Sequence, residues 1–148
     1  MIIRKFEKQD ANETARLIRK VLTEVNSKDY PQNVIHNLSR RYSTERMIKI
    51  ALKRNVYVAL ENGRIIGTAA IEDDYISNVF VDLDYHGKGL GSALMEKVEQ
   101  IARNRGKTKV RLDACITALD FYKKRGYVKR KTILSDIYGT TFEMDKMI

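Results

Sequence analysis

Apolar and polar residues alternate in several short runs of the chain and follow a helical spacing in others, which predicts strands mixed with helices. Residues 2–6 predict a short strand. Residues 11–25 predict a helix that Asp10 caps and that turns one apolar stripe inward. Two shorter helical stretches are expected after it, around residues 34–38 and 44–53.

A hairpin and a third strand are predicted in the middle of the chain. Residues 56–60 and 64–71 read as strands, and Asn62-Gly63 between them is the strongest short signal for a two-residue hairpin turn. An acidic turn then leads into a β-rich apolar run at residues 75–81. These segments predict three antiparallel strands in succession.

The second half of the chain predicts a crossover between parallel strands. The residues from Leu90 onward carry an apolar stripe at helical spacing, and Gly106 follows them as a C-terminal cap. Residues 110–114 then alternate as a strand. A strand, a helix and a strand in this order are expected to form a parallel, right-handed unit.

A last helix and two strand segments are predicted toward the end. Thr117 is expected to cap this helix, with Asp120 completing a capping box, and Gly126 is expected to end it. Residues 127–128 and 138–144 would complete the sheet. The predicted fold class is therefore α/β (α+β), with a single mixed, mostly antiparallel sheet of six to seven strands, a central parallel crossover and helices on both faces.

Length and composition predict a single domain over residues 1–148. A chain of 148 residues buries roughly 70% of the surface that its unfolded form exposes, whereas two domains would each be too small. The 43% hydrophobic and 32% charged residues are ordinary for a soluble protein. No run approaches the roughly 20 apolar residues of a membrane span, and the first residues have no signal-peptide core. We therefore expect a cytoplasmic protein without a membrane partner.

The few cysteine and histidine residues and the positive net charge limit the kinds of site and partner that we expect. Cys115 is the only cysteine, and the two histidines are far apart, so we expect neither an internal disulfide nor a metal site. The net charge of +9, from 28 basic and 19 acidic residues, favours anionic partners. Nucleic acid is the less favoured of these, because no nucleic-acid-binding motif accompanies the charge. The phosphates of a cofactor would use the same positive surface.

The glycine-rich loop before the long helix predicts an anion site. Gly87, Gly89 and Gly91 leave the main chain accessible to a phosphate, and the first amides of a helix have no partners within it. Lys88 adds a cation. The spacing fits neither a P-loop nor a Gly-x-Gly-x-x-Gly dinucleotide loop, since Ser92 stands at the sixth position of the latter.

Two motifs resemble those of the GCN5-related N-acetyltransferase (GNAT) superfamily. The glycine loop is similar to motif A, Gln/Arg-x-x-Gly-x-Gly/Ala, with His86 in place of the Gln or Arg. Residues 118–127 are similar to motif B, Ala-x-x-Phe-Tyr-x-x-x-Gly-Phe/Tyr. With the order of elements, the resemblance spans residues 3–144. Cys115 replaces an asparagine of many members, and we interpret it as a small buried residue rather than a reactive thiol.

The resemblance implies that the chain binds acetyl-CoA as a cosubstrate. In the family, the amides of the loop hold the pyrophosphate. The strand before the loop splays from its parallel neighbour, so that the pantetheine pairs with free main-chain groups. The residues that the resemblance assigns to cofactor binding are Val79, Phe80, Val81, His86, Gly87, Lys88, Gly89, Leu90, Gly91, Ser92, Cys115 and Tyr122.

The resemblance also assigns catalytic roles. The amide of Val79 would face the thioester oxygen as an oxyanion donor, and Tyr122 matches the family's general acid. Because a phenol is a weaker acid than a thiol by about 1.5 pKa units, we expect Tyr122 mainly to donate a hydrogen bond to the departing sulfur. Its alternative role is a ring packed in the core.

The general base is left open by the sequence. Tyr75 stands where many members of the family carry a glutamate base. Asp74 is adjacent, but strand alternation sends its side chain to the opposite face unless the backbone bulges. Either ordered water deprotonates the amine, or Tyr75 and a neighbouring carboxylate share this role.

Three functions fit these features of the sequence. The favoured one is an acetyl-CoA-dependent N-acetyltransferase that transfers the acetyl group directly to a primary amine of a small molecule or peptide. The alternative is a catalytically silent acyl-CoA-binding sensor, and a nucleic-acid-binding domain is the third. Tyr30 and Tyr42 would either line the acceptor pocket or pack on the core. Members of the family often dimerise, which leaves a homodimer open.

Overall fold

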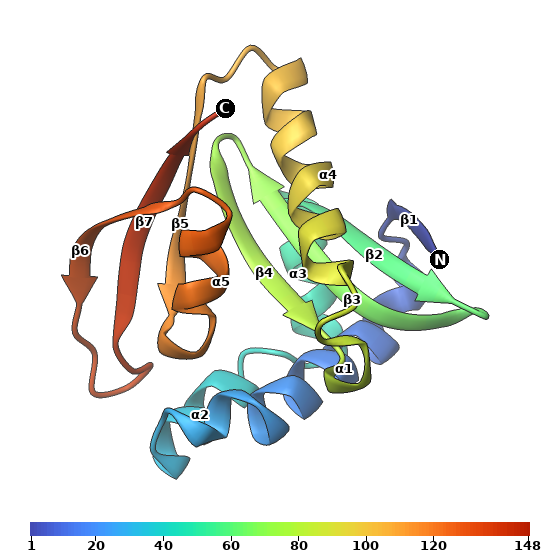
Figure 1. Cartoon of the computed structure of the whole chain (residues 1–148). Helices are drawn as coiled ribbons and strands as arrows, with labels where there is room; N and C mark the ends of the chain where they lie inside the picture. Colours follow the sequence, from blue (N-terminus) through green and yellow to red (C-terminus); the bar gives the residue numbers. More distant parts are fainter.

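A computed structural model describes all residues, 1–148, and its centre is one seven-stranded sheet with the order β1-β2-β3-β4-β5-β7-β6 (Figure 1). All neighbouring strands are antiparallel except β4 and β5. The predicted mixed, mostly antiparallel sheet is confirmed. The strands are β1 (Ile2–Lys5), β2 (Asn55–Glu61), β3 (Arg64–Glu72), β4 (Tyr75–Val81), β5 (Lys109–Cys115), β6 (Val128–Ile133) and β7 (Thr141–Met147).

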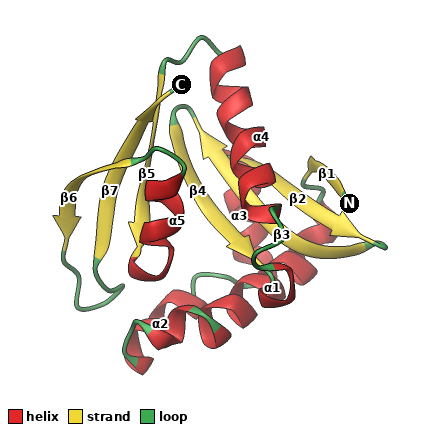
Figure 2. Ribbon diagram, viewed as in Figure 1, coloured by secondary structure: helices red, strands yellow, loops and turns green.

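Five α-helices cover the two faces of the sheet. Helices α4 and α5 lie on one face, and α1, α2 and α3 lie on the other (Figure 2). None of them combines the length and the apolar character that crossing a bilayer requires. Their bounds are α1 (Ala11–Glu24), α2 (Gln32–Ser39), α3 (Thr44–Lys53), α4 (Leu90–Asn104) and α5 (Leu119–Lys124).

Two apolar layers hold the helices to the sheet. On one face, Leu94 and Val98 of α4 are fully buried in a cluster that includes Ile76 of β4. On the other face, Ile18 of α1 and Met47 of α3 are fully buried. Burying such a side chain contributes roughly 1.5–3 kcal/mol, so the helical stripes visible in the sequence fix which surface of each helix meets the sheet.

The parallel strands β4 and β5 pair over only two positions. Tyr75 lies opposite Arg111 and Ile76 opposite Leu112, and no further pair follows. Figure 1 shows the two strands side by side at one end and diverging toward the loop that precedes α4. The divergence opens the sheet at its centre, beside the glycine loop.

Asp10 is the N-cap residue of α1, as predicted, but the capping hydrogen bond is missing there, and the predicted cap at Thr117 is wrong. The Asp10 carboxylate accepts hydrogen bonds from the Arg4 guanidinium at 2.7 and 3.0 Å and from the Glu7 amide at 2.8 Å, so the ion pair has displaced the capping hydrogen bond. Thr117 lies within a 3₁₀ turn, its hydroxyl has no partner, and α5 begins two residues later at Leu119.

The last two strands differ from their predicted bounds. Residues 127–128 hold only the beginning of a strand that continues to Ile133, and β7 begins at Thr141 rather than at residue 138. Strand β6 is an edge strand with almost every side chain exposed, and its middle is basic. An edge strand without a buried face shows no apolar alternation, which is why the sequence pattern missed most of it.

A buried carboxylate joins α4 to the C-terminal strands. Glu99 of α4 is 0% exposed and accepts hydrogen bonds from the Tyr127 hydroxyl at 2.7 Å and from Arg125 at 2.9 Å. The Lys146 ammonium lies 3.3 Å from both oxygens. Burial and the carboxylate raise the pKa of Tyr127, so its hydroxyl remains a donor. Such a charge is tolerated inside a protein only when it is fully paired.

Replacing Glu99 by alanine is expected to lower the free energy of unfolding by about 3–5 kcal/mol, because two basic side chains would lose their buried partner. The measurement is urea denaturation followed by circular dichroism. The control is Glu96→Ala on the same helix, whose side chain is 62% exposed, and it should leave stability nearly unchanged. Equal losses for the two variants would contradict the assigned role of Glu99.

Candidate active site

A cleft of about 960 Å³ opens where β4 and β5 diverge. Strand β4, the glycine loop, the first turn of α4, the end of β5 and α5 form its walls, together with residues from α1, α2 and the loop before β7. This volume is at the upper end for small-molecule sites. No three His, Cys, Asp or Glu side chains lie in positions that could hold a metal ion.

Strand β4 carries a β-bulge in the wall of this cleft. The register between β3 and β4 shifts between Thr68 and Ala70, so Asn78 and Val79 together face Ala69. Asn78 adopts a left-handed φ of 54°, a conformation that asparagine tolerates better than most residues. A bulge bends its strand and re-aims the groups that follow it, here the main chain of Val79.

A network of side chains holds the bulge. Arg54 donates to the Asn78 side-chain oxygen at 2.7 Å and to the Ser77 hydroxyl at 3.0 Å. The side-chain nitrogen of Asn78 donates to the Tyr42 hydroxyl at 3.1 Å. Glu72 lies 3.7 Å from the Arg54 guanidinium. These residues come from three separate segments of the chain, so no local sequence pattern indicates that Arg54 belongs to the site.

The two aromatic residues left open by the sequence pack in the core and also reach the wall of the cleft. Tyr42 packs edge-to-face on Phe80, with ring centroids 5.9 Å apart, and Tyr30 is buried. The Tyr30 hydroxyl donates to the Thr140 carbonyl at 2.6 Å and accepts from the Ile116 amide at 2.8 Å. Both tyrosines also line the cleft. Tyr30 therefore links the loop before β7 to the end of β5.

The main chain of Val81 points toward the gap between β4 and β5. The Asp82 amide bonds to the Ile66 carbonyl at 2.9 Å, so the neighbouring Val81 belongs to a pair without hydrogen bonds to β3. The His86 ring nitrogen lies 2.8 Å from the Val81 carbonyl oxygen. His86, at the position of the family's Gln or Arg, therefore contacts the carbonyl of Val81, the residue that the resemblance assigns to pairing with pantetheine.

The glycines of the loop have two different roles. Gly87 and Gly89 have φ values of 75° and 83°, and a Cβ at either would meet no atom within 4 Å, so both face open space. Gly89 is the N-cap of α4. A Cβ at Gly91 would lie 3.2 Å from Phe121, so this glycine lets α5 approach α4. The Lys88 ammonium lies 5.4 Å from the Tyr85 ring centre.

Tyr122 is a buried tyrosine that lines the cleft. The residue is 6% exposed, its ring packs edge-to-face on Phe121 and Tyr127, and its hydroxyl makes no hydrogen bond within the protein. Burial raises the pKa of Tyr122, and Cys115 and Tyr75 add to the rise. Tyr122 is therefore a neutral hydrogen-bond donor across the physiological pH range.

Cys115 ends β5 and lies close to Tyr122. Its sulfur lies 3.5 Å from the side-chain nitrogen of Asn26, which also lines the cleft. Burial raises the pKa of the Cys115 thiol, so the thiol stays protonated near neutral pH. Asn26 brings an amide to the place where the family motif has one at position 115. Asn26 is 89 residues from Cys115 in the chain, so the sequence pattern did not predict that the two side chains lie together.

Tyr75 is a donor, and its partner is a residue that the sequence did not single out. The Tyr75 hydroxyl donates to the Asp113 carboxylate at 3.0 Å. Burial and Asp113 raise the pKa of Tyr75 to about 12. Asp74 turns away and pairs with Arg111 at 3.0 Å, and Arg111 lies 4.9 Å from the Tyr75 ring centre. The only feature of the sequence that could have pointed to Asp113 as a site residue is its place between the apolar residues Leu112 and Ala114 of β5.

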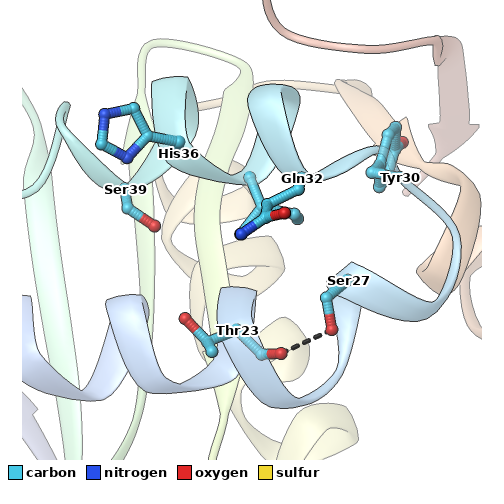
Figure 3. Close-up of a pocket in the computed structure, with 7 residues that line it drawn as sticks. Thr23, Ser27, Tyr30, Gln32, His36 and Ser39 are labelled. Carbon is cyan, nitrogen blue, oxygen red and sulfur yellow. Dashed lines mark hydrogen bonds between the residues drawn. The ribbon is translucent and has the colours of Figure 1, made fainter.

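A second, smaller pocket of about 380 Å³ lies between the end of α1 and α2 (Figure 3). Hydroxyl and amide side chains such as Thr23, Ser39 and Gln32 line it, with one imidazole, His36. The Ser27 hydroxyl is already bonded to the Thr23 carbonyl. No carboxylate or cysteine lines this pocket, whereas Asp113 and Cys115 both line the larger cleft.

Comparisons with known proteins agree with this geometry. The family model described as an acetyltransferase (GNAT) domain matches residues 21–146. An uncharacterised N-acetyltransferase of Methanocaldococcus jannaschii is 31% identical over 91 residues, or 52% of this chain and 40% of that relative. The glucosamine 6-phosphate N-acetyltransferase of Trypanosoma brucei brucei is 35% identical over 83 residues, or 49% and 56%. The matched part thus spans about half of these relatives' length.

The similarity also extends over nearly the full chain. The uncharacterised N-acetyltransferase YafP of Escherichia coli is 26% identical over 140 residues, or 95% of this chain and 89% of that protein. A GCN5-related N-acetyltransferase from Rhodopseudomonas palustris has a TM-score of 0.93 at 23% identity, covering 99% of this chain and 95% of its own. The PaiA N-acetyltransferase from Thermoplasma acidophilum, in complex with coenzyme A, has a TM-score of 0.81 at 20% identity, covering 99% and 98%. The chain therefore belongs to the GNAT superfamily of acetyltransferases.

Proposed function

We propose that the protein is an acetyl-CoA-dependent N-acetyltransferase that transfers the acetyl group directly to a primary amine of a small molecule or peptide. The observation that carries this proposal is the buried residue Tyr122, which lines the cleft and whose hydroxyl has no hydrogen-bond partner in the protein. A silent acyl-CoA sensor would need no such donor. The single-domain extent, the cytoplasmic location and a homodimer stay predictions.

The cofactor would enter along the gap between β4 and β5. Its pyrophosphate would meet the amides from Gly87 to Ser92, where the N-terminus of α4 also attracts an anion. The pantetheine would lie beside Val79, Phe80 and Val81. The Val81 carbonyl oxygen has two lone pairs, so it could accept a pantetheine hydrogen bond in addition to its contact with the His86 ring.

The reaction would use one donor on each side of the thioester. The Val79 amide, re-aimed by the bulge, would stabilise the oxyanion that forms as the amine attacks. Tyr122 would donate to the sulfur as the carbon–sulfur bond breaks. Because burial keeps this phenol neutral, it stabilises the thiolate by a hydrogen bond and need not give up its own proton.

CoA at about 100 times its dissociation constant is expected to raise the free energy of unfolding by about 2.7 kcal/mol.

Gly87→Ala should weaken CoA binding about tenfold, because an alanine strained at this φ turns the loop amides away.

The matched control is Gly63→Ala in the β2–β3 hairpin. Gly63 has the same φ of 75° and an equally open surrounding, so both substitutions cost similar stability. Only Gly87→Ala should change CoA affinity, measured by calorimetry. Wild-type protein that gains no stability with CoA would remove both the transferase and the sensor function.

Tyr122→Phe is expected to slow amine-dependent thiol release from acetyl-CoA about 100-fold while CoA affinity stays unchanged, because only the donor to the sulfur is lost. Tyr127→Phe is the control, since its ring belongs to the same aromatic cluster but its hydroxyl bonds to Glu99. Tyr127→Phe should lose stability and keep the rate. Equal rates for Tyr122→Phe and wild type would exclude the proposed donor.

A further inference from the structure

Asp113 is the only acidic residue that lines the cleft. It lies one position past the last parallel pair, Ile76 with Leu112, where β4 and β5 begin to diverge. One of its carboxylate oxygens accepts the Tyr75 hydrogen bond at 3.0 Å. The other oxygen has no hydrogen-bond partner in the protein, and the side chain is exposed to the cleft.

The carboxylates on the nearby turn are all paired with bases. They form the pairs Glu72–Arg54 at 3.7 Å, Asp73–Lys107 at 2.7 Å and Asp74–Arg111 at 3.0 Å. Asp113 forms no ion pair, although basic residues outnumber acidic ones by 28 to 19 in this chain. A carboxylate that keeps no cation of its own, inside a reaction cleft, is complementary to a cation brought by a substrate.

We propose that Asp113 binds the ammonium group of the acceptor and takes its proton, and that Tyr75 positions the carboxylate. This inference rests on the proposed function and assigns the base that the sequence left open. It also defines the acceptor class: a primary alkyl amine that arrives as a cation. Asp113, Tyr75 and Tyr122 line the same cleft, so the bound nitrogen would lie in the cleft that holds the proposed donor to the sulfur.

The proposed reaction moves two protons from the acceptor nitrogen. The ammonium gives one proton to Asp113, and its freed lone pair attacks the thioester carbonyl. The carbon–nitrogen bond forms, the carbon–sulfur bond breaks, and a second proton of the nitrogen passes to the CoA thiolate. An alkylammonium has a pKa of about 10.4, so a carboxylate holds its proton only briefly. Asp113 is exposed and can pass that proton to solvent.

The other charged and titratable groups around Asp113 are already engaged or lie on neighbouring strands. Arg111 and Arg54 are held by Asp74 and by the bulge network, respectively. The remaining groups are Tyr75 on β4, Glu143 opposite Asp113 on β7, and Lys131 opposite Glu143 on β6. Only Tyr75 is hydrogen-bonded to Asp113.

Asp113→Asn tests the inference, because it removes the charge and keeps the shape and the oxygen that faces Tyr75. With lysinamide, n-butylamine and ethanolamine as acceptors, kcat/KM for the amine at pH 7 should fall about 100-fold. The KM for acetyl-CoA should stay unchanged. The wild-type profile should be flat from pH 7 to 9, whereas the variant should gain about tenfold per pH unit, because it must bind the neutral amine.

Asp74→Asn is the matched control. It makes the same charge change on the turn before β4, but the carboxylate it removes is paired with Arg111 and does not line the cleft. Its kcat/KM and its flat pH profile should equal those of wild type. Tyr75→Phe should lower kcat/KM only about three- to tenfold and keep the flat profile, since the carboxylate remains but is held less firmly.

The outcomes separate the two proposals. If Asp113→Asn keeps the wild-type kcat/KM and flat profile, the role of Asp113 is overturned and the transferase stands. If CoA binds but no amine releases thiol, the transferase is overturned. The docking of the ammonium is then measured by calorimetry of lysinamide: binding lost in Asp113→Asn and kept in Asp74→Asn supports it, and equal binding overturns it.

Discussion

The short parallel pairing between β4 and β5 is the constraint on which the site depends. Two paired positions hold the strands together at one end, and no further pair follows toward the other end. If β4 and β5 were paired along their whole length, β5 would bond to the main chain of Val81 and the gap would be closed. Main-chain donors and acceptors in a sheet are costly to leave unpaired, so their orientation toward a cleft favours a ligand that pairs with them.

Side-chain contacts convert this gap into a shaped site. Arg54 and Tyr42 hold Asn78 in a strained conformation, and the bulge in turn sets the direction of the main chain after it. On the opposite wall, the missing side chain of Gly91 lets Phe121 approach the first turn of α4. The two sequence motifs are thus in direct contact, and the packing of one places the phenol of the other.

Burial divides the polar groups of the cleft by function. Tyr122 is enclosed by aromatic rings, which keeps its proton in place and makes it a donor. Asp113 is exposed, which suits a group proposed to exchange a proton with solvent. Tyr75 lies between these extremes and donates to Asp113. A neutral donor near the sulfur and an anion near the amine are the two groups that the proposed reaction needs.

The sequence by itself determined the order of the elements, the hairpin at Asn62-Gly63 and the glycine loop, because turn preference and apolar period act over a few neighbouring residues. The partners of Tyr75 and of the bulge were decided only by the tertiary structure. Asp113 is 38 residues from Tyr75, and Arg54 is 24 residues from Asn78. Contacts across such separations leave no periodic signal, because they arise only when the strands have taken their places in the sheet.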